Sequence, residues 1–166
     1  MTKKDIFILL AAGAAVIGAA FNVEIQTPEE FYSAHPDAVT EDSDWVTLTV
    51  ECRSIAHRKG YDKTLPENGV LIDGEKYVLT KDETVFEVIS KAAAYQRLPL
   101  DHSGGRNIYI TGIDGIYEFD FGAQSGWLYT VNGIAPDINC GEYRPKSGDE
   151  IVFKYVDTYY RGAGMS

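Results

Sequence analysis

One helical segment stands among stretches that follow the two-residue period of β-strands, and this contrast limits the fold more than any other feature. Thr84 and Glu87 have the spacing of a capping box, in which the threonine accepts from the N3 amide and the glutamate reaches back. Apolar residues then recur at helical spacing as far as Tyr95, and Pro99 ends the pattern. The sequence therefore predicts a single helix over residues 84–95.

Strand signals flank this helix on both sides. Segments that alternate in polarity, or are rich in β-branched and aromatic side chains, cover residues 45–52, 69–72, 75–79, 108–111, 116–121, 126–131 and 150–156. Some of the breaks between them are dipeptides that favour tight turns, namely Asp73-Gly74, Asp114-Gly115 and Asn132-Gly133. This order predicts an α+β, β-grasp-like domain, in which one helix packs on a mostly antiparallel, twisted sheet.

The N-terminus has the pattern of an export signal. Lys3 and Lys4 precede an uncharged apolar run over residues 6–21, which has small residues at 18–20. A basic start, an apolar stretch and small residues are typical of a secretory signal. We therefore expect residues 1–21 to form a hydrophobic helix that is a cleaved signal peptide or a retained membrane anchor. A buried helix of a cytosolic protein fits less well, because the run has no polar face.

The rest of the chain divides into a linker, one folded module and a tail. Residues 22–44 are acidic, contain Pro28 and Pro36 and show no strong period, so we expect a linker or stalk. The folded module is expected over residues 45–157, with a C-terminal tail over residues 158–166. A chain of 166 residues suits one such domain.

Composition excludes several classes of protein. The chain has 25 acidic and 15 basic residues, a formal net charge of −10, which argues against nucleic acid as a partner because phosphate binding needs clustered Lys and Arg. A hydrophobic fraction of 45% excludes a wholly disordered chain. Two cysteines supply neither a disulfide framework nor the ligand set of a zinc finger.

Residue types found in catalytic and metal sites occur without the spacing that such sites need. Asp101, His102 and Ser103 are the types of a hydrolase triad, but adjacent residues cannot adopt triad geometry with each other. His35, His57 and His102 show no i, i+4 ligand spacing, and no calcium-loop pattern is present. We therefore expect a protein that is not an enzyme and has no metal or other cofactor of its own.

Three stretches carry a resemblance to a known family. They include a Ser-Gly-Trp-Leu-Tyr-Thr-Val-Asn-Gly core and a Tyr-Arg-Pro-Lys-Ser-Gly-Asp-Glu-Ile segment, and they lie at residues 83–89, 115–133 and 142–151. Together they resemble the transcobalamin-like C-terminal domain, the DUF4430 family, over about residues 45–157. The resemblance implies a β-grasp-like fold and an exported protein of a Gram-positive bacterium. In the vitamin B12 carriers this domain caps cobalamin held against an α/α-barrel domain, so the resemblance implies cobalamin as a possible ligand.

The resemblance also bears on the cysteines. Members of the family often have cysteines at both places, so in an exported chain we expect a disulfide between Cys52 and Cys140. Such a bond would close most of the module into one loop. The other interpretation is two free buried thiols.

The strand over residues 126–131 and its turn form the candidate ligand-binding site. Trp127 and Tyr129 lie on one face of the strand by the two-residue period. In one interpretation their rings stack on a planar ligand such as a corrin ring or a sugar, while Asn132 and the backbone around Gly133 meet its polar rim. In the other interpretation Trp127 belongs to the core.

These observations favour an exported, non-catalytic module that captures or caps a small molecule, a corrinoid by the resemblance, at the cell surface. The alternative is a surface-tethered protein–protein interaction or adhesion module, with another surface protein as its partner and strand edges or tyrosine patches as docking sites. In either case we expect the protein to be extracytoplasmic, secreted or anchored to the outer face of the cytoplasmic membrane. It would meet the membrane only through residues 1–21.

Overall fold

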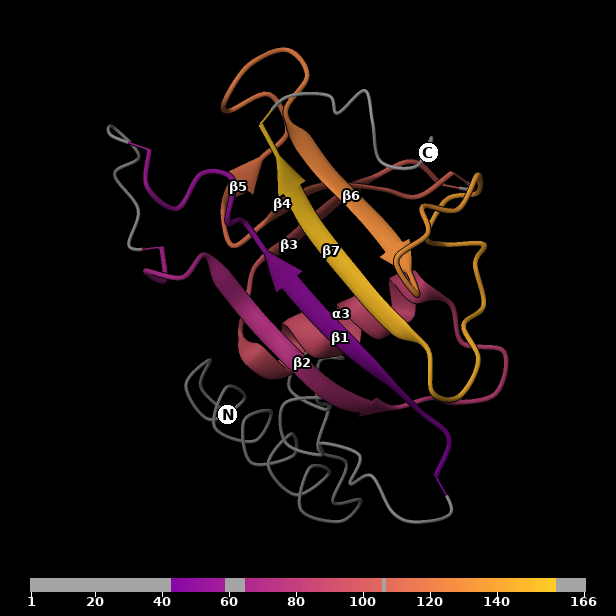
Figure 1. Cartoon of the computed structure of the whole chain (residues 1–166). Coiled ribbons are helices and arrows are strands. Elements are labelled where there is room, and N and C mark those ends of the chain that lie inside the picture. The colour runs from indigo at the N-terminus through magenta and orange to yellow at the C-terminus, as the bar shows by residue number, and fades with distance from the viewer. Residues whose placement is uncertain (1–42, 59–64, 106, 158–166) are drawn as a thin grey trace, which may run out of the picture.

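One α-helix and two β-sheets make up the part of the chain that a computed structural model describes, residues 43–58, 65–105 and 107–157 (Figure 1). The predicted α+β class is confirmed. The elements are, in chain order, β1 (Trp45–Glu51), β2 (Val70–Val78), α3 (Val85–Gln96), β3 (Leu100–Ser103), β4 (Tyr109–Ile113), β5 (Ile116–Tyr117), β6 (Gly126–Val131) and β7 (Glu150–Val156).

The larger sheet has the strand order β2-β1-β7-β6, so its first and last strands lie side by side in the centre. β1 and β7 run parallel, whereas β2 pairs with β1 and β6 pairs with β7 in antiparallel fashion. In the chain, α3 lies between the pair β1 and β2 and the pair β6 and β7. This strand order and this position of the helix are those of a β-grasp fold. The predicted β-grasp-like, mostly antiparallel arrangement therefore agrees with the structure.

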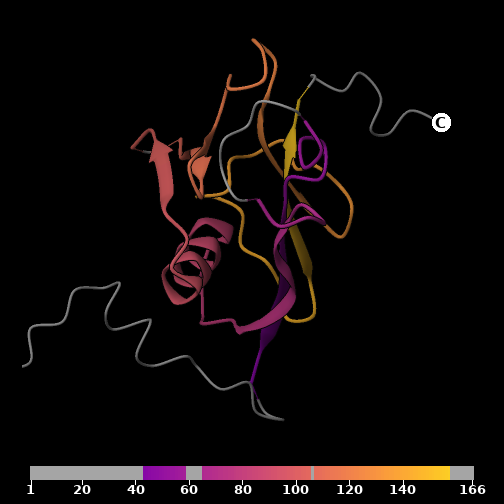
Figure 2. The same ribbon diagram turned by 90° about the vertical axis from the view of Figure 1, so that its left-hand side faces the viewer.

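The core lies on one side of the larger sheet, where α3 and the smaller sheet, β3-β4-β5, cover it (Figure 2). Alternate side chains of the central strands point into this space, as the period of a strand requires. The buried side chains that fill it include Val46, Leu48, Val50, Val88, Ile89, Ala92, Ile110, Ile113, Ile151 and Phe153.

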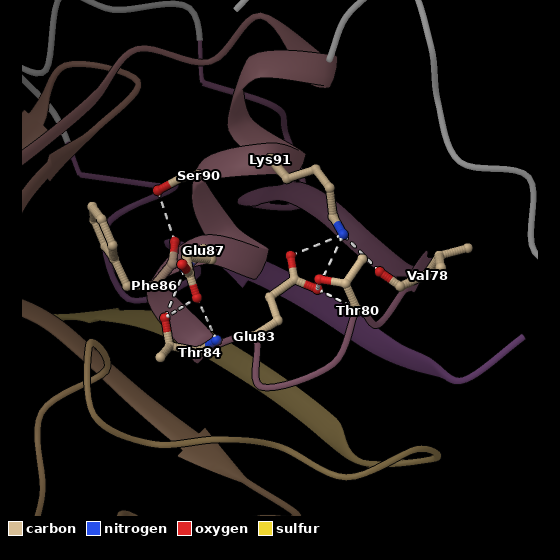
Figure 3. Close-up of polar contacts among 8 residues, drawn as sticks. All are labelled: Val78, Thr80, Glu83, Thr84, Phe86, Glu87, Ser90 and Lys91. Carbon is tan, nitrogen blue, oxygen red and sulfur yellow. Dashed lines mark hydrogen bonds and ion pairs between the residues drawn. The ribbon is translucent and has the colours of Figure 1, made fainter. Parts of the chain in front are cut away.

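α3 begins at the capping box that the sequence predicts. The Thr84 amide donates to Glu87 Oε2 at 2.7 Å, and the Glu87 amide donates to Thr84 Oγ1 at 3.3 Å (Figure 3). The helix ends at Arg97, whose φ of 58° lies in the left-handed region and whose amide bonds back to the last turn. These contacts fix both ends of the only helix in the described ranges.

A buried ion pair joins α3 to the end of β2. Lys91 is 9% exposed, and its Nζ lies 2.6 Å from the Val78 carbonyl oxygen and 3.0 Å from Glu83 Oε1 (Figure 3). Glu83 in turn accepts a hydrogen bond from the Thr80 amide at 2.8 Å. The short connection between β2 and α3 is therefore held by one cation on the inner face of the helix.

The Asp73-Gly74 pair lies in a bulge inside β2 and does not form the expected turn. The register against β1 shifts between Leu48 and Val50, so β2 accommodates an extra residue there. Gly74 has a φ of 61°, and its amide donates to Thr49 Oγ1 at 3.1 Å. A positive φ suits both a tight turn and a bulge. Because β2 pairs with β1 on both sides of Gly74, the chain forms a bulge here.

The smaller sheet differs from the prediction in two of its strands. Residues 100–103, which were not predicted as a strand, form β3 and pair with β4. β5 is shorter than the predicted segment over 116–121, because the chain turns after Tyr117. Phe119 has a φ of 69°, and its amide donates to the Ser125 carbonyl at 3.0 Å, which closes this turn.

Cys52 and Cys140 are free, buried thiols. The expected disulfide between them is therefore wrong. Burial, followed by the charge of nearby Asp114, raises the pKa of Cys52 to about 11, and the Asp114 amide bonds to the Pro99 carbonyl just beyond α3. The Cys140 carbonyl instead accepts from the Phe86 amide in the first turn of α3. The cysteines thus lie toward opposite ends of a helix about 18 Å long. That separation is too large for a disulfide.

Several expectations concern residues outside the described ranges. These are the N-terminal signal or anchor over residues 1–21, nearly all of the stalk over 22–44, and the tail over 158–166. Within the described ranges, none of the helical residues forms a segment long and apolar enough to cross a bilayer.

Candidate functional site

β6 and the turn after it carry the four residues that the sequence indicates for ligand binding. β6 is an edge strand of the larger sheet and pairs along its length with β7. Asn132 and Gly133 have φ values of 52° and 78°, as a tight turn of this kind requires. Two backbone hydrogen bonds between Val131 and Ile134, of 2.9 and 3.0 Å, close the turn. The predicted Asn-Gly turn is thus present.

The Asn132 side chain fastens the turn to the start of β7. Its Nδ2 donates to Asp149 Oδ1 at 2.8 Å, and its Oδ1 accepts from the Glu150 amide at 2.9 Å. The Asn132 backbone amide also donates to the Glu150 carbonyl at 2.8 Å. Both ends of the side-chain amide therefore have partners within the protein, and its main effect is to hold the turn in place.

Trp127 lies in the core, which is one of the two interpretations that the sequence left open. Its side chain is 3% exposed, and Nε1 donates to the Ile116 carbonyl at 2.8 Å. Its ring meets Tyr155 edge to face, with centroids 5.3 Å apart. In this arrangement the indole ties the two sheets together and presents no face to a ligand.

Tyr129 is half-buried on the same side of β6. Its ring stacks on Phe153 at 5.8 Å, and its hydroxyl donates to the Ile138 carbonyl at 2.6 Å. Burial, then the charges of Cys140 and Tyr143, raise the pKa of Tyr129 to about 12. Tyr129 therefore stays protonated at neutral pH and anchors the loop after the turn to the sheet.

Two large apolar side chains are exposed beside this turn. Ile134 is 72% exposed and Ile138 is 46% exposed, although the backbone of each is anchored to β6 as described above. Gly133 lies next to them, with open space where a side chain would be. We call Gly133, Ile134 and Ile138 the turn patch. Neither isoleucine was predicted as a site residue, although Ile134 lies in a Gly-Ile-Ala-Pro run outside any predicted strand.

The turn patch can bind a ligand through apolar contact and hydrogen bonds, without forming a covalent bond. Burial raises the pKa of the Cys140 thiol, which follows the loop, to about 11, so it is protonated at neutral pH. The patch can contribute two branched apolar side chains and the backbone groups of a fixed turn.

The other candidate residues do not form a site with one another. On β3, Asp101 accepts from the Tyr117 hydroxyl at 3.0 Å, whereas the next residue, His102, packs against Phe86 with ring centroids 4.8 Å apart. The two side chains thus point to opposite faces of the strand. Among the described residues, no group of three or more His, Cys, Asp and Glu side chains is arranged to hold a metal ion.

One comparison with known proteins matches just under half of the chain to a domain family. Residues 82–157, from just before α3 to just beyond β7, match the family described as "Domain of unknown function (DUF4430)". No curated protein matches the chain. Among solved structures, the fold is similar to that of a protein from Ruminococcus gnavus whose suggested role is metal binding. That similarity has 18% identity and a TM-score of 0.45, and it covers 70% of this chain and 99% of the other.

Proposed function

We propose that the protein, whose residues 82–157 match the DUF4430 domain family, is a non-catalytic binding module that covers one side of a ligand with its turn patch. The module does so without forming a covalent bond, through apolar contact and backbone hydrogen bonds. The rigid β-grasp sheet positions the patch, and the ligand supplies the surface that buries it.

The exposure of Ile134 is the observation that carries this proposal. The side chain of Ile134 is 72% exposed on a turn fixed by hydrogen bonds, so its burial adds little to the stability of the fold. Covering such a side chain is worth about 1.5–3 kcal/mol to a complex. Because the turn is already ordered, binding costs little conformational entropy there.

A corrinoid is the ligand that we favour, on the basis of the resemblance to the capping domain of the vitamin B12 carriers. A broad ring system with apolar faces and amide groups at its rim suits branched apolar side chains beside exposed backbone groups. The predicted export signal over residues 1–21 supports an extracytoplasmic place for this capture, either secreted or held at the outer face of the membrane.

Titration of the full-length protein with cyanocobalamin by equilibrium dialysis tests the proposal. Binding should weaken about 10-fold or more in I134S, because the apolar contact is lost. The matched control is Y95S, which removes an exposed ring of α3 that lies outside the patch. An absence of binding to wild-type protein at tens of micromolar, or equal affinity of I134S and wild type, would contradict corrinoid capture at this patch.

The second candidate function, a surface-tethered protein–protein module, is favoured by a different observation. Near the other end of β6, three aromatic side chains are exposed, those of Tyr109, Tyr117 and Phe119. The sequence predicts no ligand-binding residue there. Large exposed aromatic side chains are typical of protein interfaces. A complex that survives I134S but is lost when these rings are removed would favour this function over ligand capture.

A further inference from the structure

Two asparagine residues of the chain are followed directly by glycine, in the pairs Asn68-Gly69 and Asn132-Gly133. Asparagine is one of the thermolabile side chains. A following glycine increases its reactivity, because glycine has no side chain to hinder attack by its own amide nitrogen on the asparagine. The reaction, deamidation, converts the asparagine to aspartate or isoaspartate. Both pairs lie in the part of the chain that the structure describes, so the fold sets the reactivity of each.

Deamidation forms a ring in the chain and then consumes a water molecule. The glycine nitrogen attacks Cγ of the asparagine, which closes a five-membered ring, and the bond from Cγ to Nδ2 breaks. Nδ2 leaves as ammonia, with the proton that the glycine nitrogen gives up. Water then opens the ring at either of its carbonyl carbons and leaves a carboxylate in the chain. No group is oxidised or reduced.

The two glycine nitrogens differ in their freedom to attack. The Gly69 amide donates to the Pro66 carbonyl at 2.8 Å, and Gly69 is buried so closely that a Cβ there would lie 2.8 Å from the backbone of another segment. Gly133 is exposed, with open space where a Cβ would be, and its amide donates to no other backbone group among the described residues. The nucleophile is therefore engaged in the first pair and available in the second.

The fold instead restrains the side chain of Asn132. Its Nδ2 donates to Asp149 Oδ1 at 2.8 Å, and its Oδ1 accepts from the Glu150 amide at 2.9 Å, so both ends of the side-chain amide are held at the start of β7. The leaving group of the reaction is thus the donor of a hydrogen bond to a carboxylate. Nδ2 can leave as ammonia only when this bond to Asp149 breaks.

The backbone of the turn adds a second restraint. Asn132 and Gly133 have φ values of 52° and 78°, which are typical of a type I′ turn, and hydrogen bonds between Val131 and Ile134 close it. Ring closure needs the Cα–Cβ bond of Asn132 and its peptide bond to Gly133 to be nearly eclipsed. A type I′ turn keeps these bonds far from eclipsed, so the reaction proceeds from molecules whose turn has opened. Its rate then follows the population of the open state.

The modified side chain cannot restore the contacts that it has lost. A carboxylate in place of the amide has no Nδ2 donor and brings a second negative charge next to Asp149 Oδ1. The other oxygen of Asp149 accepts from the Lys146 amide at 2.8 Å, so this carboxylate is held in place. Isoaspartate, in addition, lengthens the backbone of the turn by one carbon atom. The turn, which carries the exposed Ile134, is therefore released from β7 by the reaction.

We propose that Asn132 is a deamidation site that its contacts with Asp149 and Glu150 keep unreactive, and that its modification permanently releases the turn from β7. Because ammonia is lost, the change is irreversible. It accumulates in each molecule in proportion to the time that the turn has spent open. Water is the only co-reactant, and ligand binding at the turn patch is not required.

Deamidation of the full-length protein in mildly alkaline buffer, followed by peptide mapping with mass spectrometry, tests the first part of this proposal. The decisive variant is D149A, which removes the acceptor of Nδ2. We expect Asn132 to deamidate about 3- to 10-fold faster in D149A than in wild type, and faster still in urea. Asn68 in the same samples is the matched control for general unfolding, because its side chain accepts from the Val70 amide instead, at 3.1 Å.

Hydrogen exchange of the Ile134 amide, which donates to the Val131 carbonyl at 3.0 Å, tests the release of the turn. N132D carries the aspartate that deamidation produces. We expect this amide to exchange about 10-fold faster in N132D than in wild type, because the turn opens more often. The matched control is N68D, which makes the same chemical change at the other Asn-Gly pair and should leave this exchange rate unchanged.

The outcomes separate local control of the reaction from general loosening of the fold. Faster deamidation at Asn132 alone in D149A, with faster exchange in N132D, supports the proposal. Equal rates at Asn132 in wild type and D149A overturn it, as do equal rates in buffer and in urea. An equal acceleration at Asn68 and Asn132 in D149A also overturns it, because general unfolding would then explain the reaction. Exchange in N132D that is as slow as in wild type contradicts the release of the turn.

Discussion

The Tyr117 hydroxyl donates a hydrogen bond to Asp101 across the width of the smaller sheet, at 3.0 Å. These residues lie on the two outer strands, and Gly112 lies between them on the central strand. The tyrosine can span the sheet because the central position has no side chain. This side-chain hydrogen bond thus adds a link between the two outer strands, across Gly112, to the backbone pairing of the sheet.

The first prediction concerns the pKa of Tyr117. The hydrogen bond to Asp101 and the charge of that carboxylate raise the pKa of Tyr117 above its usual value. D101N removes the charge, so the pKa of Tyr117 should fall toward that of a free tyrosine. A pH titration of the ¹³Cζ signal of Tyr117 by NMR measures this. An unchanged midpoint in D101N would show that the carboxylate does not perturb the hydroxyl.

The second prediction concerns Gly112. G112A places a methyl group where the Tyr117 ring lies, and a Cβ would be 2.6 Å from two ring carbons. The ring must move and the bond to Asp101 is strained, so we expect a loss of about 1–3 kcal/mol in the free energy of unfolding. Urea denaturation measures it. Gly105, which has open space around it, provides the control, because G105A should leave the stability nearly unchanged.

Local signals predicted the helix well. The Thr84–Glu87 capping box depends only on residues three apart, so the start of α3 follows directly from the sequence. The two-residue period also placed Trp127 and Tyr129 on one face of β6. The period could not say which face of β6 the core covers, because that depends on where α3 and β4 pack.

The incorrect predictions share a dependence on distant parts of the chain. Asp73-Gly74 has the same local preference in a turn and in a bulge, and the pairing with β1 selects the bulge. Cys52 and Cys140 were expected to pair because of the resemblance to a family, but α3 separates them. The exposure of Phe119 depends on a turn closed by Ser125, for which the residue types alone give little indication.

The third prediction is that both cysteines are free in the purified protein. Cys52 and Cys140 are buried and lie toward opposite ends of α3. A thiol reagent should label neither in the folded protein and both in urea, without prior reduction. Mass spectrometry counts the labels. A chain that accepts no label in urea until a reductant is added would instead contain the disulfide.

The fourth prediction is a loss of stability at alkaline pH. Burial raises the pKa of Cys52 and of Cys140 to about 11, and raises the pKa of Tyr77 to about 12. Groups with raised pKa values stabilise the fold fully below their unfolded pKa, and this contribution disappears as the pH rises through the folded value. The urea midpoint should therefore fall between about pH 9 and 12, with the cysteines contributing up to about pH 11. In C52A/C140A the fall should be smaller, and an identical fall would assign it to other groups.

The fifth prediction concerns the buried ion pair of Lys91 and Glu83, whose side chains are 11% and 8% exposed. K91M keeps the apolar stem of the lysine but leaves the Glu83 charge and the Val78 carbonyl without their cation. We expect a loss of about 3 kcal/mol in the free energy of unfolding. The double variant K91M/E83Q should regain part of this loss, because no uncompensated charge remains. If the double variant were less stable than K91M by the full effect of E83Q alone, the two residues would be energetically independent despite their 3.0 Å separation.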